Sequence, residues 1–107
     1  MNTLAIESSS RKLTVGLSLG AKVFKLSSSK INDTANALPI LTKQILKNNS
    51  IKHTDLDAIC ISTGPGSFTS LRIGMSYAKG LSLSLDIDSQ SFLRADVKDT
   101  PIPVDFA

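Results

Sequence analysis

The first quarter of the chain alternates between hydrophobic and polar positions. A short apolar run over residues 4–9 is followed, after a turn, by hydrophobic residues at every second position. These residues are Leu13, Val15, Leu17 and Leu19. A period of two is typical of a strand with one buried face, and residues 23–26 add a third strand after a turn at residues 20–22. Because the connections are short, we expect the three strands to run antiparallel.

From Thr34 onward the hydrophobic period becomes helical. Apolar residues recur at i, i+3 and i+7, and they are Leu38, Leu41 and Ile45. This spacing predicts a helix that ends at residues 48–50, with Asp33 or Thr34 as its N-cap residue. Pro39 disfavours a regular helix around it, so we expect an irregular first turn.

The second half of the chain predicts a strand, a helix and a further strand. Residues 57–62 contain four adjacent apolar residues, as in a strand that is covered on both faces. A glycine-proline turn ends this run, and a helix over residues 68–85 and a strand over residues 89–92 follow. The order β-β-β-α-β-α-β predicts an α/β fold with a mixed sheet and packed helices. This order is similar to the ribonuclease-H-like half of the actin-like ATPase (ASKHA) fold.

Composition limits the chain to one small domain without a cysteine framework. The 107 residues are 41% hydrophobic and 20% charged, which is enough apolar content for one core. The single cysteine, Cys60, excludes an internal disulfide, and the single histidine, His53, leaves no pair of histidines for a zinc site. We expect Cys60 in the core, His53 on the surface, and neither a metal nor a cofactor.

Charge is unevenly distributed along a chain whose net charge is +3. Residues 1–53 hold 8 basic and 2 acidic side chains, whereas residues 54–107 hold 4 basic and 7 acidic ones. A dispersed, solvated basic surface and a face for nucleic acid are both consistent with this asymmetry. No apolar stretch is long enough for a membrane span, and the N-terminus lacks the basic region of a signal peptide. We therefore expect a cytoplasmic protein without membrane contact.

Residues 63–74, between the buried strand and the second helix, carry the most specific pattern. The candidate loop residues are Gly64, Pro65, Gly66, Ser67, Thr69 and Arg72. The two glycines permit positive φ and a close backbone approach, and the hydroxyl side chains can cap a helix start. A structural strand-to-helix turn and an anion site at the helix N-terminus both agree with the pattern. The lysine of a P-loop is missing.

The second helix has an apolar and small-residue face of roughly 200°, wider than the roughly 100° stripe that one sheet covers. Ser70, Gly74 and Ala78 recur every fourth residue and form a low ridge that would admit a second backbone. Glycine in a helix costs up to about 1 kcal/mol, so Gly74 and Gly80 favour close helix packing. Either the first helix alone covers this face, or a partner does. The predicted partner interface consists of Leu38, Leu41, Ile45, Ser70, Leu71, Gly74, Met75, Ala78 and Leu81.

Four segments of the chain together resemble the bacterial TsaB (YeaZ) family. They are residues 4–8, 55–59, 63–74 and 78–87. The third segment reads Gly-Pro-Gly-Ser-Phe-Thr-Ser-Leu-Arg-Ile-Gly from residue 64, and this pattern is specific to that family and to the related TsaD subunit. The resemblance covers about residues 3–92.

This resemblance implies a cytoplasmic, non-catalytic subunit in the synthesis of threonylcarbamoyladenosine on tRNA. In the family, TsaB pairs with TsaD through the two helices of its N-terminal lobe. TsaD holds the metal, the nucleotide and the transfer chemistry, and the ATPase TsaE joins them. We therefore expect the chain to dock a TsaD-like subunit, or a second copy of itself as a homodimer. A TsaE-like ATPase would be an indirect partner, and tRNA would bind only through the complex.

The sequence departs from the family pattern at three places. Glu7 and Ser8 stand where members usually have Asp and Thr, and Asp33 and Thr34 stand where many have His and Ser. Glu7 and Ser8 remain candidates for a residual nucleotide contact, so half of an actin-like kinase or ATPase is the alternative function. The resemblance fades after residue 92. We expect residues 1–92 to form the N-terminal lobe and residues 93–107 a divergent, irregular tail, with the second lobe absent.

Overall fold

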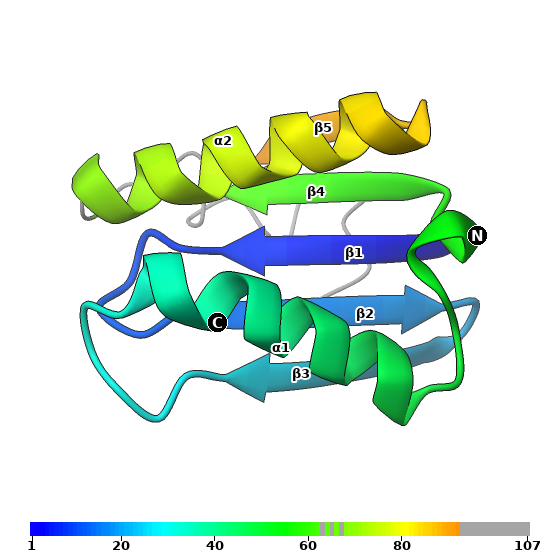
Figure 1. The fold of residues 1–107 in the computed structure, drawn as a ribbon, viewed down its shortest axis with the longest axis horizontal. Coiled ribbons are helices and arrows are strands. Elements are labelled where there is room, and N and C mark those ends of the chain that lie inside the picture. Colours follow the sequence, from blue (N-terminus) through cyan, green and yellow to red (C-terminus); the bar gives the residue numbers. More distant parts are fainter. Residues whose placement is uncertain (63, 65, 67, 93–107) are drawn as a thin grey trace.

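The computed structural model describes residues 1–62, 64, 66 and 68–92, which form one sheet and two α-helices (Figure 1). The strands are β1 (Asn2–Glu7), β2 (Thr14–Leu19), β3 (Lys22–Ser27), β4 (Ala58–Ser62) and β5 (Asp88–Phe92). The helices are α1 (Thr34–Asn48) and α2 (Phe68–Leu85), and a single 3-10 turn covers His53–Asp55.

The sheet has the strand order β3-β2-β1-β4-β5. β1, β2 and β3 form antiparallel hairpins, whereas β4 lies parallel to both β1 and β5. Parallel neighbours require a crossover connection, and α1 and α2 each lie in one of the two crossovers. Figure 1 shows both helices on the same face of the sheet, with α1 across β2 and β3 and α2 along β4. The predicted element order and the mixed sheet are confirmed.

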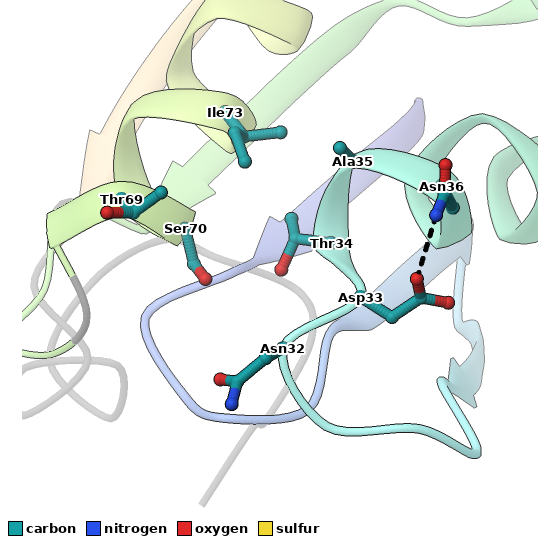
Figure 2. Close-up of a pocket in the computed structure, with 8 residues that line it drawn as sticks. All are labelled: Asn32, Asp33, Thr34, Ala35, Asn36, Thr69, Ser70 and Ile73. Atoms are coloured by element: carbon teal, nitrogen blue, oxygen red, sulfur yellow. Dashed lines mark hydrogen bonds between the residues drawn. The ribbon is translucent and has the colours of Figure 1, made fainter.

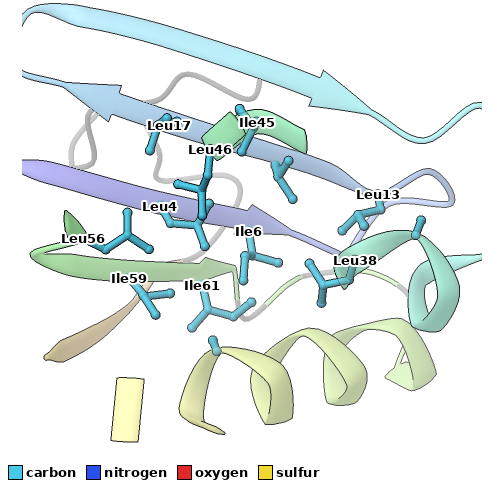
Figure 3. Close-up of a cluster of buried hydrophobic side chains, with 13 residues drawn as sticks. Leu4, Ile6, Leu13, Leu17, Leu38, Ile45, Leu46, Leu56, Ile59 and Ile61 are labelled. Atoms are coloured by element: carbon cyan, nitrogen blue, oxygen red, sulfur yellow. The ribbon is translucent and has the colours of Figure 1, made fainter. Parts of the chain in front are cut away.

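A hydrophobic core fills the space between this face of the sheet and the helices (Figure 3). Leu4 and Ile6 of β1 lie in register with Ile59 and Ile61 of β4, and all four side chains are buried. Each such burial contributes about 1.5–3 kcal/mol. A slip of one residue would turn these large side chains to the opposite face of the sheet, away from the helices. The helices complete the core with Leu38, Ile45, Leu46 and Ala78.

Helix α1 differs from the sequence-based expectation at its start. It is helical from Thr34 through Pro39, so the predicted irregular first turn does not occur. Pro39 removes one backbone N–H from the helix, whereas its neighbour Leu38 is fully buried and anchors the helix to the sheet. Asp33 occupies the N-cap position, but its side chain makes no capping hydrogen bond. Its Oδ1 instead accepts a hydrogen bond of 3.0 Å from the side-chain amide of Asn36.

Three further points concern a short 3-10 turn, the predicted tail and the expected absence of a membrane span. The 3-10 turn at His53–Asp55 is an element for which the sequence analysis made no prediction. The predicted tail over residues 93–107 lies outside the described residues, as do Thr63, Pro65 and Ser67. Neither of the two described α-helices is both long enough and apolar enough to cross a bilayer.

The β2–β3 turn gives a first testable prediction. Gly20 has a φ of +63°, and a Cβ added there would meet nothing within 4 Å. Conformation alone therefore penalises a side chain, and we expect Gly20→Ala to lower the free energy of unfolding by about 1 kcal/mol. Asparagine adopts positive φ more readily, so Gly20→Asn should lose less. Urea unfolding measures both variants, and equal losses for the two would contradict a conformational cause.

Candidate functional site

The ridge of Ser70, Gly74 and Ala78, continued by Ser82, faces the sheet of the chain itself. A Cβ added at Gly74 would lie against Ser8 Oγ, 3.0 Å from Ser8 Cβ and 3.2 Å from Ile61 Cδ1. Ser8 follows β1 and Ile61 belongs to β4. Helix α2 therefore approaches the end of β1 more closely than any side chain at position 74 would permit.

The predicted partner interface is wrong for its central residues. The ridge is buried within the chain, and so are Leu38 and Ile45 of α1. The spacing of small residues correctly indicates a close backbone approach. The neighbour that makes this approach is the segment around Ser8 and Ile61, not a second molecule.

The outer surface of the two helices carries exposed hydrophobic side chains of its own. Among the predicted interface residues, Met75 is 45% exposed. The half-buried ones are Leu41, Leu71 and Leu81. Three strongly exposed apolar residues were not part of the prediction, because they fall outside the spacing of the core positions. Phe68 and Leu83 lie on α2 together with Met75, and these three residues make up what we call the outer helical face. The third additional residue, Ile40 of α1, lies apart from them, beside residues 28–30 after β3.

The glycine turn before α2 packs against the segment that follows β1. Gly64 has a φ of +112° and Gly66 a φ of +158°. A Cβ at Gly66 would overlap the backbone carbonyl of Ser9, so only glycine permits this approach. The structural-turn alternative accounts for both glycines without a ligand. Pro65 and Ser67 lie outside the described residues.

Thr69 and Arg72, the remaining candidate loop residues, are exposed in the first turns of α2. The Arg72 guanidinium lies over the ring of Phe68, 5.6 Å from its centroid. Such a cation–π contact contributes about 0.5–1 kcal/mol at an exposed site. The contact holds both side chains at the beginning of the outer helical face.

Glu7 and Ser8, the candidates for a nucleotide contact, are both buried at the end of β1. Glu7 Oε1 accepts hydrogen bonds from the backbone N–H of Ser9, at 2.6 Å, and from the Ser9 hydroxyl. Among the residues that the structure describes, Glu7 Oε2 and Ser8 Oγ have no hydrogen-bond partner. In the part of the chain that the structure describes, no group of three His, Cys, Asp or Glu side chains could hold a metal ion.

Cys60 is buried in β4, as the sequence predicts, and burial raises the pKa of its thiol. The thiolate is the reactive form, so we expect slow alkylation by iodoacetamide in the native protein and rapid alkylation in urea. The neutral thiol also stabilises the fold below the ordinary thiol pKa of about 8.5, and this stability is lost as the pH rises through the raised value. The urea midpoint should fall over this range, and less so in Cys60→Ala. Equal alkylation rates with and without urea would contradict the burial.

Part of the basic excess of the first half gathers at the C-terminal end of α1. His53, half-buried, lines a hollow there of about 470 Å³. Three lysines line the same hollow, and they are Lys43, Lys47 and Lys52. Positive charges near the C-terminal end of a helix stabilise the helix, because they interact favourably with the helix dipole.

Comparison with known families matches residues 31–90 to the family described as TsaD, tRNA N6-adenosine threonylcarbamoyltransferase. The match runs from the segment before α1 into β5 and covers more than half of the chain. It includes both helices and the glycine turn between β4 and α2.

Individual relatives point to the same group of proteins. The chain is 38% identical over 85 residues to the tRNA threonylcarbamoyladenosine biosynthesis protein TsaB of Buchnera aphidicola from Schizaphis graminum, covering 78% of this chain and 40% of that protein. It is 46% identical over 52 residues to a tRNA N6-adenosine threonylcarbamoyltransferase of Porphyromonas gingivalis, covering 49% of this chain and 15% of that protein. The chain thus spans less than half the length of these relatives.

Solved structures support the fold. YeaZ from Pseudomonas aeruginosa superimposes with a TM-score of 0.83 at 21% identity, over 92% of this chain and 51% of that one. RuvC from Thermus thermophilus gives a TM-score of 0.54 at 11% identity, over 100% of this chain and 72% of that one. The fold is the actin-like, ribonuclease-H-like fold that the element order predicts.

Proposed function

Because the chain belongs to the family described as TsaD, tRNA N6-adenosine threonylcarbamoyltransferase, and is similar to curated TsaB proteins, we propose that it is a docking subunit in the synthesis of threonylcarbamoyladenosine on tRNA. In this role it binds a TsaD-like catalytic subunit and contributes no catalytic residue itself. A TsaE-like ATPase and tRNA meet it only within the complex. Without a TsaD-like subunit, the same surface pairs two copies of the chain.

The observation that carries this proposal is the outer helical face. Of the seven large hydrophobic residues that are exposed in the described part of the chain, four lie on α1 and α2. Phe68 and Leu83 of α2 are 73% and 72% exposed. Scattered single apolar residues need no explanation, whereas three on one helix, α2, favour a protein partner for that helix. Aromatic and methionine side chains are also enriched at such interfaces.

Light scattering on mixtures of the chain with a TsaD-like subunit tests the proposal. The chain has a mass of 11.4 kDa. We expect the measured mass of the mixture to equal that of one TsaD-like subunit plus one copy of the chain. For the isolated chain, we expect a measured mass of about twice that of a single copy. Two separate peaks at all concentrations, with the chain monomeric, would exclude docking and self-association together.

The alternative function, a nucleotide-binding half of an actin-like kinase or ATPase, draws support from one observation. Glu7 Oε2 is a buried carboxylate oxygen without a partner at the end of β1. Calorimetry with ATP and Mg²⁺ separates the two functions. Binding heat that disappears in Glu7→Gln would favour the alternative, and the absence of heat in the parent chain would remove it.

A further inference from the structure

A pocket of about 350 Å³ lies between the N-terminal ends of α1 and α2 (Figure 2). The sequence pattern allowed an anion site at the start of α2 but could not show its second wall at the start of α1, because the two walls are separated by more than thirty residues and meet only in the folded chain. The lining consists of Asn32, Asp33, Thr34, Ala35, Asn36, Thr69, Ser70 and Ile73. All but two of these residues carry a polar side chain. The volume is in the range of small-molecule sites.

The first turns of both helices line this pocket. Backbone N–H groups in the first turn of an α-helix have no partner within the helix, and the N-terminal end carries a partial positive charge. Neither α1 nor α2 has an acidic residue in its first turn to neutralise that charge. The Asp33 side chain makes no capping hydrogen bond, so it leaves the first N–H groups of α1 available to a ligand.

The Thr34 hydroxyl is an independent sign of a ligand. Thr34 is only 3% exposed, and its Oγ1 has no hydrogen-bond partner within the described part of the chain. Figure 2 shows this oxygen directed into the pocket, toward the side chain of Ser70. A buried hydroxyl without a partner costs about 1–3 kcal/mol, and a ligand that accepts its hydrogen bond would remove this cost.

We propose that this pocket binds a phosphate-sized oxyanion, held by the first-turn N–H groups of α1 and α2 and by the Thr34 hydroxyl. Oxyanions accept several hydrogen bonds at once and are stabilised at the positive ends of helices. The volume exceeds that of inorganic phosphate alone, so the pocket also has room for a group esterified to it. The inference goes beyond the proposed docking role and is tested on the isolated chain.

One charged residue, Asp33, lines the pocket and opposes an anion. Its carboxylate keeps the affinity of the native chain low. Removal of this charge should therefore tighten binding, whereas it would weaken a cation or an ammonium group. Asp33→Asn keeps an oxygen that can accept the hydrogen bond from Asn36, so the start of α1 is preserved. Tighter binding in Asp33→Asn therefore indicates an anionic ligand, and weaker binding indicates a cationic one.

Titration of the full chain with inorganic phosphate, followed by amide NMR at constant ionic strength, tests the proposal. We expect saturable shifts at the starts of α1 and α2 in the parent chain. Thr34→Val should weaken binding about tenfold, Thr34→Ser should restore it, and Asp33→Asn should strengthen it several-fold.

Thr42 provides the matched control. It is also fully buried on α1, its Oγ1 also has no partner, and it does not line the pocket. Thr42→Val should leave the phosphate affinity unchanged within a factor of about two. No saturable shifts at the helix starts, equal losses in Thr42→Val and Thr34→Val, or weaker binding in Asp33→Asn would each overturn the proposal.

Discussion

Replacing Gly74 by alanine is expected to lower the free energy of unfolding by about 1–3 kcal/mol. The new methyl group would lie against Ser8 Oγ, 3.0 Å from Ser8 Cβ and 3.2 Å from Ile61 Cδ1. The gain in helix propensity, up to about 1 kcal/mol, opposes this loss but is smaller. The Ser8 hydroxyl can rotate away, whereas its Cβ moves only with the backbone. Urea unfolding monitored by circular dichroism measures the change.

Gly80 is the matched control on the same helix. A Cβ there would meet nothing within 4 Å. Gly80→Ala should therefore raise stability by about 0.5–1 kcal/mol, through helix propensity alone. Ser8→Ala combined with Gly74→Ala should recover part of the loss, because the hydroxyl in the overlap is gone. If Gly74→Ala were as stable as Gly80→Ala, the ridge would not pack against Ser8.

Replacing Met75 by aspartate is expected to weaken docking of a TsaD-like subunit about thirtyfold or more. Met75 is the predicted interface residue that the structure leaves most exposed, on the outer helical face. A charge buried against an apolar partner surface lacks its hydration, and central interface residues contribute about 2 kcal/mol or more. That free energy corresponds to about thirtyfold in affinity. Calorimetric titration with the TsaD-like subunit measures it.

Val23 provides a control of equal exposure on another part of the molecule. It is 44% exposed, against 45% for Met75. It lies on the edge strand β3 in register with Ser18, whose side chain is on the sheet face opposite to that of the core residue Leu17. Val23→Asp should therefore leave the affinity for the TsaD-like subunit within a factor of about two. Equal losses in the two variants would mean that the helices are not the docking surface.

Most of the fold could be predicted because hydrophobic periods report burial directly. Leu13, Val15 and Leu17 alternate and are buried on one face of β2 and the turn before it. The four adjacent apolar residues at positions 58–61 correctly indicated a strand that is buried on both faces. Element order then restricted the sheet to a mixed one, since hairpins are antiparallel and helical crossovers connect parallel strands.

The neighbour of a helix face could not be predicted in the same way. Helical spacing identifies which residues share a face, but it does not say whether the sheet or a partner lies opposite. Ser70, Gly74 and Ala78 therefore form a close-packing ridge, as expected, whose neighbour is Ser8 and not a second molecule. The wide apolar face of α2 therefore has two parts. Its small residues pack against the sheet, whereas single large hydrophobic residues are exposed to solvent.

The pocket between the helix starts was also beyond the sequence pattern. The sequence identifies Thr34 only as a residue at the beginning of a helix. The folded structure is needed to show that its hydroxyl is buried without a hydrogen-bond partner among the described residues. Glu7 presents the same difficulty, because its burial at the end of β1 depends on neighbours that are distant in sequence. Long-range proximity of polar groups has no periodic signal.

Photo-crosslinking from single introduced cysteines tests most directly whether the outer helical face docks a TsaD-like subunit. Cys60 is buried, so a cysteine placed at a surface position is the reactive thiol for a benzophenone-maleimide label. We predict that label on Met75→Cys crosslinks to the TsaD-like subunit upon irradiation, whereas label on Val23→Cys does not. Crosslinks from position 23 and none from position 75 would contradict the account.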